Sequence, residues 1–561
     1  MQSTFWKHGA WKLWVAAVLS AGLLELPFPL AGPMPPWRSI FAWFGLVPLL
    51  WALLSPASLD APRPLRRGFL LGYLCGVLWY IGNCYWVRDT MLRYGDMPPM
   101  APTLLLIGYS LVLGIYFGLF SLGVVLVRRA TGNTRWALVF APFLWAALEL
   151  AASRITSVPW DQLGYSQVDN VLINQLAPWT GVYGISFLLV FVNALLTGGM
   201  MLRSRPHIGH RDRMILRATG VLLIMAGAAG VSIPPPHPAS TATAVLIQPN
   251  LDVASENLWS RPGEWEQHIA EFQRLAGEQC KKYIAGIPQT HASTGEIICP
   301  PYPTHPDLIV WPESPAPFIE QNARFEQAVT SISRQAQAPL IVGNLGVDSS
   351  LEGGLNYYNS ARIEGADGAR VGRYDKIHLV PFGEYIPYKE LLFFAHKLTG
   401  RVSEFTRGTD RKVFRLPTAN GEAHRYGVFI CYESVFADEV RHFAQLGAEV
   451  LVNISDDGWY GDTSAPWQHL NMARMRAIEN RRWILRDTNN GVTAVIDPYG
   501  RVRQSIPRHQ TDVLPAGYGF RRDVTFYTAH GDVFGWLCVL VSFGVVVGSG
   551  KMLLRAWASA S

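Results

Sequence analysis

The stretch Tyr426-Gly-Val-Phe-Ile-Cys-Tyr-Glu433 places a thiol directly after an apolar run that has the length of a buried strand. Two further strand-like runs are followed by reactive side chains: Leu308-Ile-Val310 leads to Glu313, and Arg370-Val-Gly-Arg-Tyr374 leads to Lys376. A thiol, a carboxylate and an amine on separate segments are the components of a covalent acyl-transfer site. Taken singly, each of these residues is more often an ordinary core or surface residue, so the inference depends on their shared context.

The composition indicates a membrane protein with a polar insertion. Of 561 residues, 49% are hydrophobic and only 16% are charged, against about 25% charged in typical soluble domains. The apolar residues are concentrated in the first 233 positions and the last 30. The net charge of +6 is explained by basic residues beside membrane spans, and no basic run interleaved with aromatic residues suggests a nucleic-acid partner.

Eight apolar segments approach the ~20 residues that a helix needs to cross a bilayer. We expect these spans at residues 11–29, 39–55, 68–86, 102–127, 136–153, 180–202, 214–233 and 532–550. The predicted domains are therefore transmembrane helices 1–7 in residues 1–233, a catalytic domain in residues 234–531, and helix 8 with a short tail in residues 532–561.

The basic residues between the predicted spans are distributed unevenly, and this bias predicts the orientation. With a cytoplasmic N-terminus, 15 Lys and Arg residues fall on the cytoplasmic side and only four, Arg38, Arg88, Arg93 and Arg154, fall in the short outer loops. Both termini are then cytoplasmic, and the catalytic domain lies on the opposite side of the membrane.

The predicted catalytic domain alternates strand and helix signals. Short apolar runs bounded by Pro, Gly or Asn predict buried strands, residues 264–275 and 467–482 have helical spacing, and residues 492–502 predict a hairpin. This alternation favours layered α/β packing.

The six cysteines fit an oxidising compartment on the outer side. Cys280 and Cys299 lie 19 positions apart in a polar stretch, and they either pair in a disulfide or are two unrelated thiols. Cys431 then has no obvious partner, which makes it a candidate reactive thiol. The others, Cys75, Cys84 and Cys538, lie in or at the edges of predicted spans and are expected to pack there.

Longer motifs point to a known family. The blocks Trp311-Pro-Glu-Ser314, Tyr374-Asp-Lys-Ile-His-Leu-Val-Pro-Phe-Gly-Glu-Tyr385 and Ile430-Cys-Tyr-Glu-Ser434 resemble the three signature blocks of the nitrilase superfamily. With residues 453–461, 466–477 and 488–494, and with the predicted spans, the chain is more narrowly similar to the apolipoprotein N-acyltransferases, the membrane family that completes bacterial lipoproteins. It departs from the family pattern in a longer segment at about 277–306 and in Asp456, where Asn is expected.

The resemblance implies an αββα sandwich in which Glu313, Lys376 and Cys431 form a catalytic triad. It further implies that Glu384 and Glu433 support the triad, although ordinary ion pairing remains an alternative for both. Aromatic positions of the family match Trp259, Tyr432 and Trp459, which would line the substrate entrance or simply pack.

The implied reaction moves a fatty acyl chain from a phospholipid to Cys431 as a thioester. The chain then passes to the α-amine of the diacylglyceryl-cysteine of an apolipoprotein. The reaction is ping-pong and needs no cofactor, metal or nucleotide. The family resemblance implies a multi-pass protein of the bacterial inner membrane with a periplasmic catalytic domain, and we expect a monomer whose partners are the two lipid substrates and the bilayer.

Two other functions remain open at this stage. A membrane-tethered amidase or nitrilase would use the same triad with water as the acceptor, whereas a transporter or receptor would need intramembrane charges along a path. The predicted spans hold few charges, chiefly Glu25 and Glu149. We also expect mobile apolar loops at 385–405 and 456–466 to cover the site and to dip into the bilayer, and we interpret His469 as a structural residue.

Overall fold

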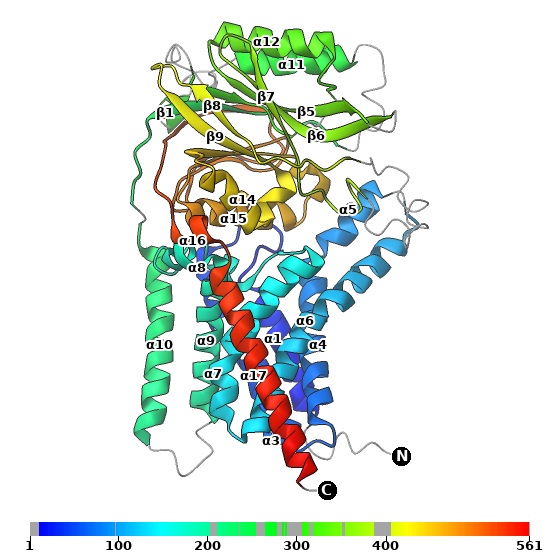
Figure 1. The fold of residues 1–561 in the computed structure, drawn as a ribbon, viewed down its shortest axis with the longest axis vertical. Coiled ribbons are helices and arrows are strands. Elements are labelled where there is room, and N and C mark those ends of the chain that lie inside the picture. Colours follow the sequence, from blue (N-terminus) through cyan, green and yellow to red (C-terminus); the bar gives the residue numbers. More distant parts are fainter. Residues whose placement is uncertain are drawn as a thin grey trace, which may run out of the picture.

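The computed structural model describes residues 10–95, 97–201, 210–234, 236–253, 264–277, 283–284, 287–288, 306–313, 318–350, 354–385 and 405–559. These residues form a bundle of long apolar helices with a layered α/β domain stacked on one end (Figure 1). The predictions that concern Trp259, Cys280, Cys299, residues 386–404 and most of the 277–306 segment fall outside the described residues.

The bundle contains the following helices, with 3-10 helices and one π-helix (η2) marked η: α1 (Trp11–Glu25), η1 (Pro36–Trp43), α2 (Val47–Leu54), α3 (Pro56–Leu59), α4 (Pro64–Asn83), α5 (Trp86–Tyr94), α6 (Ala101–Thr131), α7 (Thr134–Ala151), η2 (Ala152–Thr156), η3 (Leu163–Gln167), η4 (Ile173–Leu176), α8 (Ala177–Thr180), α9 (Val182–Met201), α10 (His210–Ser232) and α17 (Val533–Ala558). Each of the eight apolar segments expected from the sequence overlaps at least one of them.

Within the described residues, five helical segments are long and apolar enough to cross a membrane: Pro36–Leu54, Ala101–Thr131, Thr134–Thr156, Val182–Met201 and Val533–Ala558. A sixth is obtained if α4 and α5, which meet at an angle of 47°, form one broken span. Two of the eight expected spans fall short by length, because α1 has 15 residues and the apolar part of α10 covers only Ala218–Ser232. The helices establish an integral membrane domain in which five or six described segments meet this length and composition, and the number of eight spans stays a prediction.

Small residues allow two bundle helices to approach closely. A Cβ atom on Gly72 of α4 would lie 2.0 Å from the Ser121 hydroxyl of α6, and one on Gly76 would lie 2.6 Å from Phe117. Such small-residue contacts are typical of membrane helices, where close van der Waals packing replaces the hydrophobic effect.

The α/β domain contains two six-stranded sheets. The first has the order β14 (Asp512–Tyr518), β1 (Ala242–Gln248), β4 (Leu308–Val310), β5 (Leu340–Ser349), β6 (Leu355–Glu364), β7 (Arg370–Asp375). The second has the order β13 (Val502–Ile506), β12 (Thr493–Ile496), β11 (Ile484–Thr488), β10 (Val450–Ser455), β9 (Ala423–Ile430), β8 (Val413–Pro417). The central strands β1, β4 and β5, and likewise β9, β10 and β11, are parallel, and the outer strands are antiparallel. A separate short hairpin joins β2 (Tyr283–Ile284) to β3 (Ile287–Pro288).

Side-chain alternation along the strands builds four layers. In β1, Ala244 and Leu246 pack between the two sheets, whereas Val245 and Ile247 face a second core beneath α11 (Glu264–Gly277) and α12 (Ala323–Ala336). The outer face of the other sheet is covered by α14 (Ala437–Gln445) and α15 (Ala465–Asn480). The expected αββα sandwich is therefore present.

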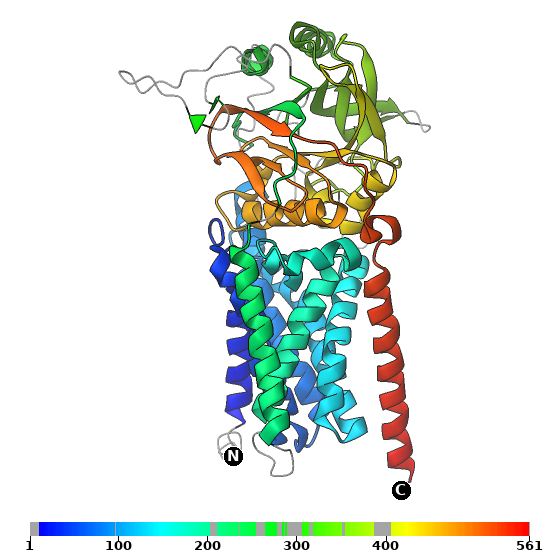
Figure 2. The ribbon, with the colours of Figure 1, turned by 90° about the vertical axis from the view of Figure 1, so that its left-hand side faces the viewer.

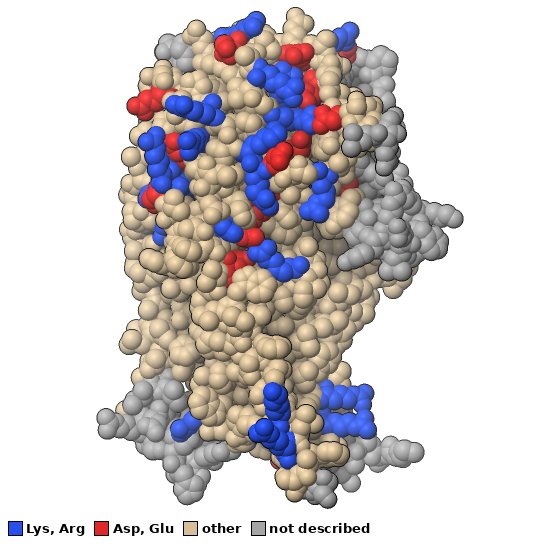
Figure 3. Space-filling view, viewed as in Figure 1, with Lys and Arg blue, Asp and Glu red and all other residues tan. Residues whose placement is uncertain are grey.

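The sandwich rests on the bundle through its inner helix layer. Figure 2 shows the orange helix, α15, lying across the end of the bundle. The chain leaves the sandwich through α16 (Phe526–His530) and continues as α17 along the side of the bundle. Helix α1 begins and α17 ends at the opposite end of the bundle. The face in Figure 3 has a broad belt without charged side chains over the helices, between a charged sandwich and a few basic side chains at the far end.

Candidate active site

The candidate nucleophile sits in a strained turn at the end of β9. Cys431 starts the short 3-10 helix η7 (Cys431–Val435) and has φ +48°, a left-handed conformation that L-residues rarely adopt. Such a residue costs about 1–3 kcal/mol and persists only where its surroundings hold it in place. Glu433, which is fully buried, provides one restraint because its Oε2 accepts from the backbone N–H of Ile430 at 2.7 Å.

Glu433 also ties this turn to the segment that carries the lysine. Its Oε1 accepts from the backbone N–H groups of Ile377 at 2.6 Å and His378 at 3.1 Å, and from the Tyr374 hydroxyl at 2.8 Å. One carboxylate therefore joins the ends of β9 and β7, which belong to different sheets. Glu433 is thus placed where the predicted supporting role requires it, and the role itself stays a prediction.

Lys376 lies between two carboxylates and is almost fully buried. Its Nζ is 3.1 Å from Glu313 Oε1 and 2.8 Å from Glu384 Oε1. The side-chain amide of Asn359 donates to the same two oxygens, at 2.7 Å each. The second oxygen of Glu384 accepts from the Val380 backbone at 2.7 Å, so the cluster is fixed from several directions.

The buried charges control the protonation of the lysine and the cysteine. Burial alone would lower the pKa of Lys376, but Glu313 and Glu384 outweigh it and raise that pKa well above its usual value. Burial raises the pKa of the Cys431 thiol well above its usual range, Glu313 adds to this, and Lys376 opposes it. The resting site thus contains an ammonium group and a neutral thiol.

The strand ends bring the three predicted catalytic residues to one edge of the sandwich. Glu313 follows β4, Lys376 follows β7, and Cys431 follows β9, and the charges of Glu313 and Lys376 both act on the thiol. The second oxygen of Glu313 accepts from the backbone N–H of Asp456, at the end of β10, at 2.8 Å. The carboxylate is therefore held by both sheets, with one oxygen on Lys376.

Two consecutive aspartates behind the site have opposite electrostatic environments. Burial and the neighbouring Glu313 raise the pKa of Asp456 well above its usual value, which favours the neutral acid. Burial would do the same to Asp457, but Arg486, 2.7 Å away, and His469 lower its pKa below the usual carboxyl range. A neutral carboxyl has the shape and charge of an amide, which accounts for Asp456 at a position where the motif is expected to have Asn.

His469 completes a buried network under the nucleophile. Its Nδ1 lies 2.9 Å from Asp457, while its Nε2 lies 3.1 Å from the carbonyl oxygen of Cys431 and 2.6 Å from the Ser434 hydroxyl. Burial and the neighbouring Arg486 lower the pKa of His469. The imidazole thus faces the backbone of Cys431, as expected of a structural residue.

Two of the predicted substrate-lining residues, Tyr432 and Trp459, lie at the boundary with the bundle. Tyr432 is buried and its hydroxyl donates to the carbonyl of Ser157 at 3.1 Å. Trp459, 47% exposed, packs edge-to-face on Tyr94 of α5 with ring centroids 5.1 Å apart. The Tyr94 hydroxyl donates to the Gly458 carbonyl at 2.9 Å. Residues 456–466 are thus mostly buried and packed against α5. That this loop is mobile, covers the site and dips into the bilayer stays a prediction.

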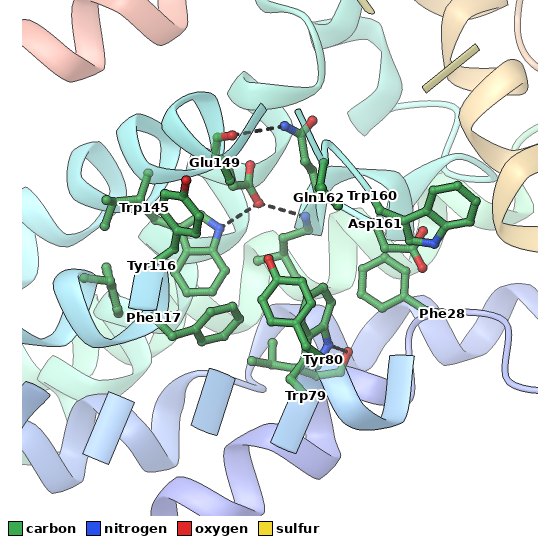
Figure 4. A pocket seen from close by; sticks show the side chains of 16 residues that line it. Phe28, Trp79, Tyr80, Tyr116, Phe117, Trp145, Glu149, Trp160, Asp161 and Gln162 are labelled. Atoms are coloured by element: carbon green, nitrogen blue, oxygen red, sulfur yellow. Dashed lines mark hydrogen bonds between the residues drawn. The ribbon is translucent and has the colours of Figure 1, made fainter. Parts of the chain in front are cut away.

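The bundle holds a cavity on the membrane side of α15 (Figure 4). Its wall is largely aromatic, and Glu149 lies in that wall, where it accepts from the indole N–H of Trp145 and the backbone of Leu163, both at 2.8 Å. Another wall residue, Trp160, stacks on His469 with ring centroids 6.1 Å apart. The apolar interior of the bundle therefore continues to within one side chain of the network that holds Cys431.

Sequence reasoning missed Asn359 and Arg486. Asn359 lies within β6, where no neighbouring motif distinguishes it, and its role depends on β6 pairing with β7, which lets its carbonyl accept from the Lys376 N–H at 2.9 Å. Arg486 is a charged residue in the central, fully buried strand β11. A charged residue in a predicted buried strand is the sequence signal that could have identified it. Within the described ranges, no group of three or more His, Cys, Asp or Glu side chains is arranged to hold a metal ion.

Comparison with known proteins gives two family matches on the same chain. Residues 244–517 match the carbon-nitrogen hydrolase family, and residues 20–195 match the apolipoprotein N-acyltransferase N-terminal domain. Among solved structures, an amidase of the nitrilase superfamily from Nesterenkonia aligns with 52% of this chain and 95% of its own, at 17% identity and a TM-score of 0.34. A nitrilase-superfamily protein from Saccharomyces cerevisiae aligns with 50% of this chain and 90% of its own, at 16% identity and a TM-score of 0.34.

Curated relatives cover nearly the whole chain. An apolipoprotein N-acyltransferase from Geobacter metallireducens is 34% identical over 532 residues, which is 94% of this chain and 93% of the relative. One from Allorhizobium ampelinum is 30% identical over 501 residues, 88% of this chain and 87% of the relative. The sandwich and its matched region define a membrane-bound member of the carbon-nitrogen hydrolase class. Within that class, the chain belongs to the apolipoprotein N-acyltransferase family.

We expect the substitution of Asp by Asn to affect stability very differently at positions 456 and 457. Asp456→Asn replaces a neutral acid by a similar amide, and we expect the free energy of unfolding to change by less than about 1 kcal/mol. Asp457→Asn leaves the buried guanidinium of Arg486 without its charged partner, and we expect a loss of about 3–5 kcal/mol. Thermal unfolding of both full-length variants measures the difference, and equal losses would contradict the assignment of charge.

The raised pKa of Cys431 predicts slow alkylation at neutral pH. Only the thiolate reacts, and burial and Glu313 disfavour the thiolate, so its fraction at pH 7 is smaller than that of a free cysteine. We expect the rate of modification by iodoacetamide to keep rising from pH 7 to above the ordinary thiol range. Peptide mapping by mass spectrometry follows Cys431 separately from the other cysteines. A rate that is already at its plateau at pH 7 would show a thiolate and refute the assignment.

Proposed function

We propose that this protein transfers a fatty acyl chain from a phospholipid to the α-amine of the diacylglyceryl-cysteine of apolipoproteins, with Cys431 as the covalent carrier. Membership of the family supports the reaction, since the relatives bear the name apolipoprotein N-acyltransferase. The observation that carries the assignment of residues is the buried ammonium of Lys376, held by Glu313 next to the thiol of Cys431.

In the first half-reaction, Glu313 takes the thiol proton while the sulfur of Cys431 attacks the ester carbonyl of the phospholipid. The carbonyl oxygen becomes an oxyanion, and Lys376 stabilises it as a preorganised cation in a site without bulk water. One such donor is typically worth about 3–4 kcal/mol. The carbon–oxygen bond then breaks, Glu313 returns the proton to the departing alkoxide, and a lysophospholipid leaves behind the thioester on Cys431.

In the second half-reaction, the lipoprotein amine attacks the thioester carbonyl and Glu313 accepts a proton from its nitrogen. The carbon–sulfur bond breaks, an amide forms, and Glu313 returns the proton to the sulfur. In this scheme removal of the thiol proton and attack occur together, which needs the fixed position that Lys376, Asn359 and Asp456 give to Glu313.

In this proposal Glu384 orients Lys376, and Glu433 holds the nucleophile turn against the lysine segment. Tyr432 and Trp459 line the side from which the lipid enters, and Trp259 is proposed for the same surface from its match to the family motif. The protein acts as a monomer without a cofactor.

The membrane arrangement is also a proposal. Residues 1–233 and 532–561 form the membrane domain with eight membrane-inserted segments, two of them shorter than a full span. Residues 234–531 form the catalytic domain on the periplasmic side of the inner membrane, and both termini are cytoplasmic. The excess of Lys and Arg beside the expected cytoplasmic ends supports this orientation, as in the last turns of α6 and α17.

A membrane-tethered amidase with water as the acceptor is the rival function. The matched N-terminal domain is named after the acyltransferase, and this favours acyl transfer over hydrolysis. The apolar cavity next to α15 also suits a site that receives lipid, because carrying a long acyl chain through water costs about 0.8 kcal/mol for each CH₂ group.

Incubation with phospholipid should add one acyl chain to the purified protein, seen by intact mass spectrometry, and subsequent addition of a diacylated lipopeptide should remove it and yield an N-acylated product. Cys431→Ala should abolish the adduct, and Glu313→Gln should slow its formation by at least about 100-fold, in the range of a lost general base. Fatty acid released without N-acylated lipopeptide would favour the amidase. An adduct that persists in Cys431→Ala would refute the choice of nucleophile.

The proposed orientation predicts which introduced cysteines a membrane-impermeant maleimide can reach. Ala419→Cys, in an exposed turn of the sandwich, should react in spheroplasts, and Ser559→Cys, after α17, should react only after lysis. The unaltered protein provides the background from native cysteines. The reverse pattern would overturn the orientation.

A further inference from the structure

Helix α15 lies between the bundle and the nucleophile, and two consecutive side chains on it have different hydrogen-bond partners. Gln468 contacts the bundle and His469 contacts the Cys431 turn, and both side chains are completely buried. The catalytic scheme above uses neither residue.

Gln468 bonds to three separate segments of the bundle. Its amide N–H₂ group donates to the carbonyl of Pro29, at 3.3 Å, and to the carbonyl and side-chain oxygens of Asn83, both at 3.1 Å. Its amide oxygen accepts from the indole N–H of Trp160 at 2.8 Å. Both the donating and the accepting halves of the amide are used, so a carboxylate of the same size could not replace it.

The most informative of these partners is Asn83, the last residue of α4. After it the chain bends by 47° into α5. The final carbonyls of a helix have no partner within the helix and need a donor from elsewhere. Gln468 supplies one, while the Asn83 amide donates to Asp161 at 2.9 Å. Hydrogen bonds at Asn83 therefore connect the bend between α4 and α5 to helix α15 of the sandwich.

The next residue along α15 transmits this position to the nucleophile. His469 lies 3.1 Å from the carbonyl oxygen of Cys431, whose left-handed conformation must be held from outside. Asp457 fixes the other side of the imidazole and belongs to η8 (Asp457–Tyr460), which is itself bonded to α5 through Tyr94 and Gly458. Two consecutive residues of one helix cannot move independently, so the position of the Cys431 thiol is coupled to the position of the bend between α4 and α5.

We propose that Gln468 is a positioning residue that sets the place of the Cys431 thiol relative to the membrane-held acyl donor. The inference rests on the proposed function, in which the donor is a phospholipid that stays in the bilayer. A donor of this kind is presented at a depth that the bundle determines, and an error of about 1 Å in such an alignment can cost about 100-fold in rate. A small soluble ester is not held at a fixed depth in the bilayer and does not depend on this alignment.

The test compares two acyl donors in the full-length protein reconstituted in liposomes. Gln468→Met keeps the length of the side chain and removes its hydrogen bonds. We expect the rate of Cys431 acylation from liposomal phospholipid to fall at least about tenfold, and the rate from p-nitrophenyl butyrate to stay within about twofold. Intact mass spectrometry of the thioester measures both rates. Asn471→Ala, on the same helix, removes a bond that Arg474 donates within α15; it serves as the matched control and should change neither rate.

A second variant guards against a general loss of folding. Gln468→Glu keeps the side-chain length and the acceptor for Trp160 and loses the donors to Pro29 and Asn83, so it should show a defect that is again confined to phospholipid. Equal losses with both donors in the two variants, or no loss with either donor, would overturn the proposal. If the unaltered protein is acylated by p-nitrophenyl butyrate but not by phospholipid, the proposed function itself fails, and this result is distinct from any outcome of the variants.

Discussion

The site depends on one buried cation shared by two carboxylates. Removing an ammonium group from water is costly unless opposite charges and hydrogen bonds replace its solvation, and Lys376 obtains both from Glu313 and Glu384. The amide of Asn359 bonds to the same two oxygens, which limits their freedom to turn toward other partners. Because this cluster needs residues from the segment after β4, from β6 and from the segment after β7, these strands of the first sheet must be in place before the charges can be compensated.

The same cluster determines how the thiol behaves. Glu313 and Lys376 have opposing effects on the pKa of the Cys431 thiol, and burial raises that pKa, which favours the neutral thiol. In the proposed scheme this cysteine is unreactive at rest and attacks when an acyl carbonyl lies close enough for proton removal and attack to coincide. Its reactivity would then be governed by geometry more than by a standing negative charge.

Local sequence predicted the parts of the molecule that follow from periodicity and motifs. The α/β layering, the helix of α15 and the hairpin between β12 and β13 follow from apolar spacing and turn residues, and the three reactive residues were recognisable because each follows a strand. The contribution of Asn359 was not predictable, because it arises from the register of β6 against β7. The bend after Asn83 was also hidden, since an apolar segment reads as one span whether it is straight or broken, and hydropathy does not record that α1 is too short to cross the membrane alone.

The burial of α15 between the sandwich and the bundle has a consequence for how the protein can be handled. Its face toward the bundle carries Gln468, whose side-chain amide has its described partners, Pro29, Asn83 and Trp160, in the bundle. A sandwich excised as a free-standing soluble fragment would expose this face and lose those partners. We therefore expect the catalytic domain to become active only after membrane insertion, so that a newly made chain does not react with lipids before its helices are in the membrane.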